Sequence, residues 1–315
     1  MLLEVRNLKT HFRMSRTKTV HAVDGVSLKI EENEILGLVG ESGCGKSTLG
    51  RTVAGLQPRT SGDILFRGRE LPSRYTVDNF REYSREIQMI FQDPYASLNP
   101  RMTVKEIISE PMRLQSGGSS SDYGPLVGQW LERVGLKAEQ MARYPHEFSG
   151  GQRQRIGIAR ALILQPKFVV CDEPISALDV SVQAQVISLL QELKETLGLT
   201  LLFIAHDLSM VRYISDRMAV MYLGSVVEEG PAEEVYFEPK HPYTRMLIAS
   251  NPAPDPAAER KRPLQQLQGE IPSPINLGEG CRFAGRCPEV RTECRTVTPK
   301  PKFTDSKRMI ACHLY

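Results

Sequence analysis

The sequence has no hydrophobic run long enough to cross a lipid bilayer. Its longest apolar stretches, such as Leu201–Ala205, fall far short of the roughly 18 residues that a membrane-spanning helix needs. The first residues carry charges at Glu4 and Arg6, so we expect no signal peptide. These absences predict a soluble protein of the cytosol.

The composition also lacks any strong bias. Of the 315 residues, 41% are hydrophobic and 24% are charged, which are ordinary values for a globular protein. They exclude a collagen-like, coiled-coil or wholly disordered chain. We find no internal repeat, and the length suits one large domain or two small ones.

Cysteine is nearly absent from the body of the chain, where only Cys44 and Cys171 occur. The other four cysteines are Cys281, Cys287, Cys294 and Cys312. Residues 259–315 hold 11 Lys and Arg against 6 Asp and Glu, and nine of the 21 prolines lie between Pro252 and Pro301. Because the basic residues are scattered among prolines and acids, the first interpretation of this tail is a solvated, irregular segment.

Three continuous apolar runs indicate buried strands, at Ile35–Gly40, Phe168–Cys171 and Leu199–Ala205. Between the last two, Val180–Leu197 has helical spacing and is followed by Gly198, a residue typical of helix C-termini. Strands that alternate with helices predict a parallel α/β sheet.

Residues 40–47 read Gly-Glu-Ser-Gly-Cys-Gly-Lys-Ser and match the phosphate-loop pattern G-x-x-x-x-G-K-[ST]. Glycines allow a tight turn whose N–H groups cradle a polyphosphate, and the following helix adds its positive end. We expect Lys46 to reach the β- and γ-phosphates and Ser47 to bind Mg²⁺. The predicted ATP-binding residues of this loop are Gly40, Glu41, Ser42, Gly43, Cys44, Gly45, Lys46, Ser47 and Thr48.

Two carboxylates, Asp172 and Glu173, follow the apolar run that begins at Phe168. The first suits the water shell of Mg²⁺ at a strand end, and the second could polarise an attacking water as a general base. A phosphate loop with such a pair still leaves kinases, GTPases, helicases and transporters open.

Phe148–Gln152 (Phe-Ser-Gly-Gly-Gln) precedes a helix-like run and resembles the signature motif of ATP-binding cassette (ABC) proteins, with Phe in place of the usual Leu. The resemblance implies an α/β P-loop NTPase fold of ABC type: a RecA-like core, an antiparallel β subdomain and a helical subdomain at about 95–158. In that family the signature of one subunit completes the ATP site of the opposite subunit. The residues implied for this role are Ser149, Gly150, Gly151 and Gln152.

Other landmarks of the family follow in order. Gln92 resembles the Q-loop glutamine, which is implied to contact Mg²⁺ and the attacking water and to report on the membrane partner. Asp179 resembles the aspartate of the D-loop, which communicates across the dimer, and His206 resembles the switch histidine on the γ-phosphate. Phe12 resembles the aromatic residue that stacks on adenine, although a plain core residue is the alternative interpretation.

Each motif occurs once and no long heptad insert is present, which argues against the translation-factor and DNA-repair types of ABC protein. Gln92–Met102 and His241–Arg245 resemble the F-type ATP-binding subunits of bacterial and archaeal oligopeptide/dipeptide permeases. The resemblance implies an ABC nucleotide-binding domain over residues 1–240 and a permease-type C-terminal extension over 241–315.

The function implied is ATP hydrolysis that drives import of dipeptides or oligopeptides, at the cytoplasmic face of the membrane. The implied partners are a second, similar ATP-binding subunit, two transmembrane permease subunits and an extracytoplasmic peptide-binding protein, with no nucleic acid. Three alternatives remain: a soluble ABC ATPase acting on nucleic acid or ribosomes, a degenerate cassette that only binds ATP, and an importer of nickel chelates, glutathione or oligosaccharides.

The tail cysteines have the spacing C-x5-C-x6-C-x17-C. Four cysteines allow two disulfides, a zinc site or an iron–sulfur cluster, and a cytosolic setting disfavours the disulfides. The short C-x2–4-C pairs usual for structural zinc are absent here. The permease resemblance implies a 4Fe–4S cluster on these four residues, with Zn²⁺ as the alternative.

Overall fold

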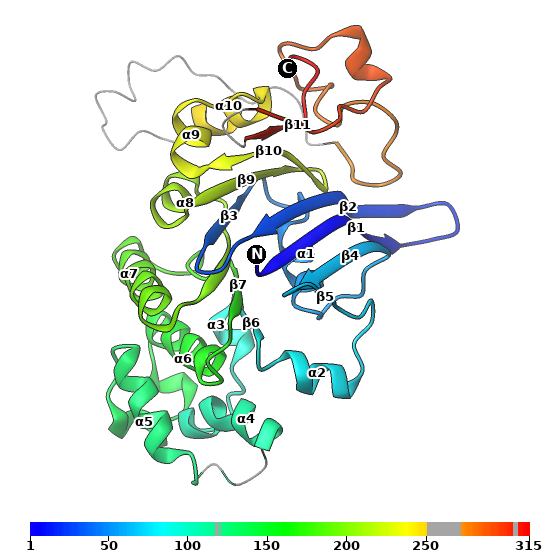
Figure 1. Ribbon diagram of the computed structural model, residues 1–315. Coiled ribbons are helices and arrows are strands. Elements are labelled where there is room, and N and C mark those ends of the chain that lie inside the picture. Colours follow the sequence, from blue (N-terminus) through cyan, green and yellow to red (C-terminus); the bar gives the residue numbers. More distant parts are fainter. Residues whose placement is uncertain (117–118, 120, 251–271, 305–307) are drawn as a thin grey trace, which may run out of the picture.

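The fold was analysed in a computed structural model. The residues that it describes are 1–116, 119, 121–250, 272–304 and 308–315. Two β-sheets form its frame (Figure 1). The large sheet has the strand order β11-β12-β10-β9-β3-β8-β7-β6. Its strands are β3 (Ile35–Val39), β6 (Ile87–Ile90), β7 (Phe168–Asp172), β8 (Thr200–Ile204), β9 (Arg217–Tyr222), β10 (Ser225–Pro231), β11 (Lys302–Phe303) and β12 (Met309–Ile310).

The centre of the large sheet is parallel, because β6, β7, β8, β3 and β9 pair in that sense. Every residue of β3, β7 and β8 is buried, as expected when both faces of a parallel sheet are covered. Along β8, Leu201 and Phe203 belong to one hydrophobic core, and Leu202 and Ile204 belong to a second core on the other face. The three strands predicted from apolar runs are thus confirmed.

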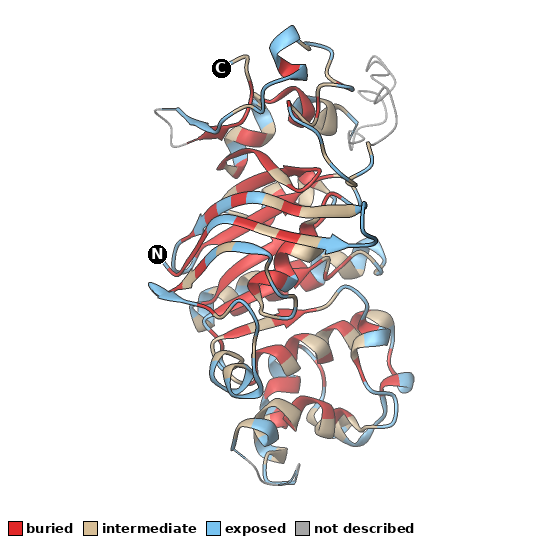
Figure 2. Cartoon of the chain, turned by 90° about the vertical axis from the view of Figure 1, so that its right-hand side faces the viewer, coloured by how far each residue is buried: buried red, intermediate tan, exposed pale blue. Residues whose placement is uncertain are grey.

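The small sheet is antiparallel, with the order β2-β1-β4-β5. Its strands are β1 (Leu3–Arg13), β2 (Thr19–Ile30), β4 (Ser61–Phe66) and β5 (Arg69–Glu70). Helix α1 (Lys46–Val53) contacts strands of both sheets, so the two sheets enclose it. Figure 2 shows the partly exposed strands of this sheet in front of the buried strands of the large one.

The remaining α-helices lie between the strands or after them in the sequence, several of them in succession. They are α2 (Val77–Tyr83), α3 (Pro94–Ser97), α4 (Val104–Ser116), α5 (Gly124–Arg133), α6 (Gly150–Leu162), α7 (Val180–Leu197), α8 (Leu208–Ile214), α9 (Ala232–Phe237) and α10 (Pro242–Ala249). Helix α7 has the predicted limits, and Gly198 ends it in the left-handed conformation with φ 63°. None of the helices within the described residues is both long and apolar enough to cross a membrane.

Helices α3 to α6 lie between β6 and β7 in the sequence and gather at one end of the molecule (Figure 1). Helix α6 packs against α3, α4, α5 and α7 and against β6, and Trp130 of α5 is fully buried in the same core. Short 3₁₀ turns at Ala138–Ala142 and Pro145–Glu147 lead from α5 into α6. This region covers the residues where the helical subdomain is expected.

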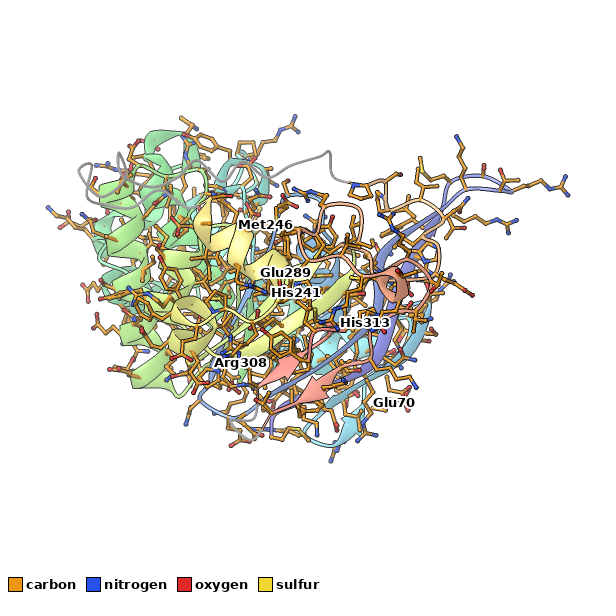
Figure 3. All side chains as sticks on the ribbon, turned by 90° about the horizontal axis from the view of Figure 1, so that it is seen from above. Glu70, His241, Met246, Glu289, Arg308 and His313 are labelled. Carbon is orange, nitrogen blue, oxygen red and sulfur yellow. The ribbon has the colours of Figure 1, made fainter. Side chains whose placement is uncertain are left out.

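The C-terminal segment is tied to the body by its last strands. Strand β12 pairs with β10 and thereby extends the large sheet. Beside it, the buried Arg308 donates to the carboxylate of the buried Glu228 and to the carbonyl of Glu238. Figure 3 shows Arg308 among the elements of this end of the molecule. A second tie is the isolated bridge between Val20 of β2 and Ile275.

Candidate nucleotide site and the contacts around it

The phosphate loop leaves the end of β3 and enters α1, as predicted. The loop needs glycine for two reasons: its backbone has positive φ values, and a side chain would collide with the backbone of neighbouring strands. Gly45 has φ 106°, and a Cβ atom there would lie 1.9 Å from the carbonyl oxygen of Ala22. Gly40 has φ 152°, and its Cβ would lie 2.2 Å from the carbonyl oxygen of Met221. Strands β2 and β9 therefore press directly on the loop.

Lys46 lies at the first position of α1 with 4% of its surface exposed. Its Nζ donates to the carbonyl oxygens of Gly40 at 2.8 Å and Glu41 at 3.1 Å, so the ammonium group curls back over the loop. A buried ammonium group needs such partners, and the N-terminus of α1 adds positive potential at the same place. The loop thus concentrates positive charge and N–H groups where an anion could bind.

The next residue joins the loop to β7. The Ser47 hydroxyl donates to Asp172 Oδ1 at 2.7 Å, and Asp172 is fully buried. Burial raises the pKa of Asp172, although the Ser47 hydrogen bond and the Arg51 charge act to lower it. Asp172 Oδ2 has no hydrogen-bond partner within the described residues and only a distant ion pair with Arg51 Nε at 3.9 Å, so a cation placed closer would supply the partner that this buried oxygen lacks. Ser47 and Asp172 are therefore two oxygen ligands that could hold Mg²⁺.

Glu173 brings two of the other predicted residues together. Its Oε2 accepts a hydrogen bond of 2.8 Å from Gln92 Nε2 and lies 3.7 Å from His206 Nδ1. Glu173 has φ 44°, an uncommon conformation for a residue with a side chain. The backbone is held there because the Glu173 N–H donates to the Ile204 carbonyl and the Ser176 hydroxyl donates to the Glu173 carbonyl. This carboxylate, one residue after Asp172, is available to a water molecule.

The signature residues form the start of α6. Ser149 is the N-cap, and its hydroxyl accepts from the Gln152 N–H, while the Gln152 side chain accepts from the Ser149 N–H. This reciprocal arrangement is a capping box. A Cβ atom on Gly151 would lie 2.4 Å from Val182 Cγ1, so glycine permits the close packing of α6 on α7.

The structure does not gather all the predicted residues into one cluster. Helix α1 packs on β7 and β8, whereas α6, which carries the signature, packs on the other helices of its region and on β6. Asp179 is the exposed N-cap of α7, and Phe12 lies on β1 with 38% of its surface exposed. The exposure of Phe12 argues against the alternative that it is a plain core residue.

The four tail cysteines are free and line one small pocket together with His241, Glu289 and His313, which Figure 3 labels. Cys281 donates its N–H to the Cys294 carbonyl, and burial raises the pKa of the Cys281 thiol to about 11. The described residues include no three of these sulfurs within 4.8 Å of one another. Four thiols around one small pocket have the ligand chemistry of a thiolate-bound metal ion or an iron–sulfur cluster.

Sequence reasoning missed the contacts of the tail with the phosphate loop. Arg286 donates from both terminal nitrogens to the Glu41 carboxylate, at 2.8 and 2.9 Å. The Glu41 N–H donates to the Tyr243 hydroxyl at 2.9 Å. Tyr243 belongs to the His241–Arg245 stretch noted in the sequence, but nothing in that pattern reveals where the hydroxyl group points.

A group of polar residues on the small sheet was also missed. His11, His21 and Asp24 offer ligand atoms that all lie within 4.8 Å of one another. Only the pairing of β1 with β2 brings His11 opposite His21, so a search for closely spaced motif residues does not find them.

A loop of this shape between β3 and α1, with the Ser47–Asp172 pair and a carboxylate at the end of β7, is the site of a P-loop NTPase, and the signature residues at the start of α6 point to the ATP-binding cassette class. Comparisons agree: the family model "ABC transporter" matches residues 23–176. The solved ATP-binding cassette MJ0796, a dimer bound to ADP and phosphate, aligns with a TM-score of 0.67 at 26% identity over 73% of this chain and 99% of that one. The structure of cbiO1 from Clostridium perfringens aligns with a TM-score of 0.66 at 28% identity, covering 75% of this chain and 91% of that one.

A second family model and two individual proteins identify the group of ABC transporters to which the chain is similar. The model "Oligopeptide/dipeptide transporter, C-terminal region" matches residues 227–294. YkfD of Bacillus subtilis is 56% identical over all of this chain and 95% of its own length. The oligopeptide transport ATP-binding protein OppF of Salmonella typhimurium is 53% identical over 95% of this chain and 92% of its own. The chain belongs to the ATP-binding subunits of the oligopeptide/dipeptide ABC transporters and is an ATPase of that family.

Proposed function

We propose that this chain hydrolyses ATP to power the import of oligopeptides or dipeptides through a membrane permease. The observation that carries the proposal is the joining of Ser47 to Asp172 and of Gln92 to Glu173 at the ends of parallel strands. It is supported by the similarity to oligopeptide transport ATP-binding proteins over nearly the whole chain.

Each of these residues has its own role in phosphoryl transfer. This reaction depends mainly on the positions of the reacting groups and on neutralisation of the phosphate charge. Lys46 and the loop N–H groups bind the phosphates, and Ser47, Asp172 and Gln92 hold Mg²⁺. The metal, when bound, neutralises charge on the phosphate oxygens. Glu173 accepts a proton from the attacking water, and His206 contacts the γ-phosphate. Phe12 stacks on the adenine ring.

A second, similar ATP-binding subunit completes the site. The signature residues 149–152 lie on a different helix from the phosphate loop, and the family resemblance implies that they serve the ATP bound by the opposite subunit in a head-to-tail pair. Asp179 and Val180, which is 79% exposed, lie at the start of α7 and are free to meet that partner. The dimeric state printed for MJ0796 is consistent with this pairing.

The permease docks on a cleft of about 560 Å³ between the core and the helical region, and this peripheral contact holds the chain at the cytoplasmic face of the membrane. The cleft is lined by Phe91, Gln92, Leu114 and Arg160, among others. Gln92 also donates to Glu173, so one side chain joins the docking cleft to the proposed catalytic base. Two permease subunits and an extracytoplasmic peptide-binding protein complete the complex.

We assign residues 1–240 to the nucleotide-binding domain, with the helical subdomain at about 95–158, and residues 241–315 to the C-terminal extension. Cys281, Cys287, Cys294 and Cys312 bind a 4Fe–4S cluster that clips the extension together. Four free thiols around one pocket support a thiolate-bound metal centre, and the resemblance to the permease ATPases favours the cluster over Zn²⁺. Iron and sulfide analysis of anaerobically purified protein tests it, and stoichiometric zinc without iron would overturn it.

The test of the function is ATPase activity in proteoliposomes that contain the permease subunits, the second ATP-binding subunit and this chain. We expect peptide-loaded binding protein to stimulate hydrolysis, and Lys46→Ala in this chain to reduce the stimulated rate sharply. Stimulation by RNA or DNA instead, lost at high salt, would favour a soluble nucleic-acid ATPase.

A further inference from the structure

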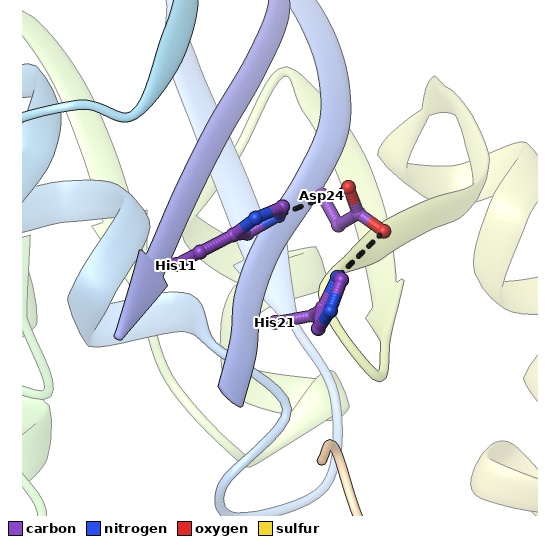
Figure 4. A group of neighbouring side chains, drawn as sticks. All are labelled: His11, His21 and Asp24. Atoms are coloured by element: carbon purple, nitrogen blue, oxygen red, sulfur yellow. Dashed lines mark hydrogen bonds and ion pairs between the residues drawn. The ribbon is translucent and has the colours of Figure 1, made fainter. Parts of the chain in front are cut away.

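The small sheet carries a cluster of three potential metal ligands (Figure 4). His11 on β1 and His21 on β2 are direct cross-strand partners, and their ring centroids lie 4.2 Å apart. Asp24 lies three residues after His21 on the same strand. His11 Nε2 is 3.1 Å from Asp24 Oδ1, and His21 Nδ1 is 3.5 Å from Asp24 Oδ2. Two imidazoles and one carboxylate thus converge from adjacent strands.

The chemistry of these groups suits a metal ion. His11 Nε2 donates to Asp24 Oδ1 in the metal-free chain, and a metal bound at this nitrogen would replace that proton. His21 Nδ1 is buried and has no hydrogen-bond partner in the part of the chain that the structure describes. Burial acts to raise the pKa of Asp24, but the Arg282 charge and the His11 hydrogen bond hold it below its ordinary value, so the carboxylate is ionised. One ligand atom from each residue lies within 4.8 Å of the other two, so small side-chain rotations bring them to the separation of roughly 3.4 Å expected around one tetrahedral Zn²⁺.

We propose that His11, His21 and Asp24 form a binding site for Zn²⁺, with a fourth position left to water. Imidazole is a ligand that zinc prefers, whereas Mg²⁺ and Ca²⁺ need several charged or carbonyl oxygens. The cluster contains one carboxylate, that of Asp24, within the described part of the chain, so the site selects against those two cations. It is separate from Ser47 and Asp172, which lie on α1 and β7.

Two protein cations compete with the metal for Asp24. Lys9 Nζ lies 3.5 Å from Asp24 Oδ1, and Arg282 of the extension donates to Asp24 Oδ2 at 2.5 Å. Arg282 also donates to the Leu223 carbonyl, so it could release Asp24 without losing its other partner. Zinc binding and the Arg282–Asp24 ion pair therefore oppose each other.

Because zinc and Arg282 compete for Asp24, zinc binding would also affect the contacts that support the phosphate loop. The neighbouring residue Ala22 presses its carbonyl oxygen on Gly45 of the phosphate loop, and the Asp24 N–H donates to the Gly224 carbonyl. Zinc would thus loosen a contact between the extension and the strand that supports the loop.

The test is titration of the metal-stripped full chain with Co²⁺, followed by absorption spectroscopy, and with Zn²⁺, followed by calorimetry. Cobalt on His11, His21 and Asp24 gives weak visible bands, whereas cobalt on the tail cysteines adds intense thiolate charge-transfer bands, so the two sites are told apart. We expect His21→Gln to weaken zinc binding at the thiolate-free site by about 100-fold, by loss of one of three ligands. His146→Gln, at an exposed histidine on a 3₁₀ turn, is the matched control and should change nothing.

A second variant tests whether the three residues bind zinc or only stabilise the sheet. Arg282→Gln removes the competing cation and should strengthen zinc binding roughly tenfold, because one positive charge leaves the neighbourhood of the metal. No thiolate-free site in the wild type, or one that His21→Gln and Arg282→Gln leave unchanged while both remain folded by circular dichroism, would overturn the proposal. Should His21→Gln fail to fold, the direction of the Arg282→Gln effect alone decides.

Discussion

Arg286 of the C-terminal segment holds Glu41 of the phosphate loop through two hydrogen bonds of 2.8 and 2.9 Å. The two residues are 245 positions apart in the sequence, and their side chains are only 4% and 14% exposed. Planar, two-pronged pairing of this kind fixes orientation as well as distance. The extension therefore braces the loop that is proposed to bind the phosphates of ATP.

Arg286→Met should destabilise the protein and weaken ATP binding. The substitution leaves the Glu41 carboxylate without its partner in a poorly hydrated place, which costs about 3 kcal/mol by analogy with other broken buried pairs. Chemical denaturation and ATP titration measure the two effects. Arg291→Met, at a side chain that is 54% exposed, is the control. Full recovery of stability in the double variant Glu41→Gln, Arg286→Met would show that the unpaired charge caused the loss, and an unaltered single variant would refute the brace.

Glu173→Gln should abolish most ATP hydrolysis while preserving ATP binding. Glutamine is similar in size and its oxygen can still accept from Gln92, but it cannot take a proton from water. Loss of a general base costs about 10² to 10⁴ in rate. Phosphate release and nucleotide titration check the two halves of the prediction, with the exposed Glu192→Gln on α7 as the control. A hydrolysis rate near that of the wild type would remove Glu173 from the mechanism.

Gly151→Ala and Gly157→Ala should have opposite effects, although both alter helix α6. A methyl group at Gly151 would lie 2.4 Å from Val182 Cγ1, so α6 must shift away from α7 and carry the signature residues with it. Among the residues that the structure describes, no atom outside the helix's own backbone lies within 4 Å of a methyl group at Gly157, where alanine favours the helix by about 0.5 to 1 kcal/mol. Thermal melts and ATPase rates of the assembled complex test the two variants. Equal changes in melting temperature and in ATPase rate would contradict the packing argument.

Asp172→Asn should raise the melting temperature at pH 7 in the absence of Mg²⁺. Burial raises the pKa of Asp172, so the folded chain binds this proton more readily than the unfolded chain does. Such a carboxyl lowers stability at neutral pH, and its penalty disappears as the pH falls through the raised pKa. The advantage of the variant should therefore shrink toward acidic pH, as melts in EDTA at several pH values would reveal. An advantage independent of pH, or one shared by the exposed Asp78→Asn, would contradict this cause.

Sequence patterns predicted the centre of the fold because local physics determines it. The apolar runs became β3, β7 and β8, and the spacing from Val180 to Leu197 with Gly198 after it gave both ends of α7. The phosphate loop was found for the same reason, since its glycines and Lys46 are adjacent in the chain.

The missed contacts are those that only the folded chain creates. The Arg286–Glu41 pair joins distant segments, and the spacing of residues carries no signal for it. His11 and His21 meet through strand register, and irregular pairing next to His11 shifts that register in a way the alternation of residues does not predict.

In the proposed function, ATP hydrolysis at this site drives peptide uptake. Uptake of a labelled oligopeptide into proteoliposomes containing the complete permease, with ATP supplied on the side of this chain, tests it most directly. We predict ATP-dependent accumulation with the wild-type chain and none above background with Glu173→Gln at equal protein content. Accumulation that is as fast with Glu173→Gln, or that is absent with the wild type while ATP is hydrolysed, would contradict the account.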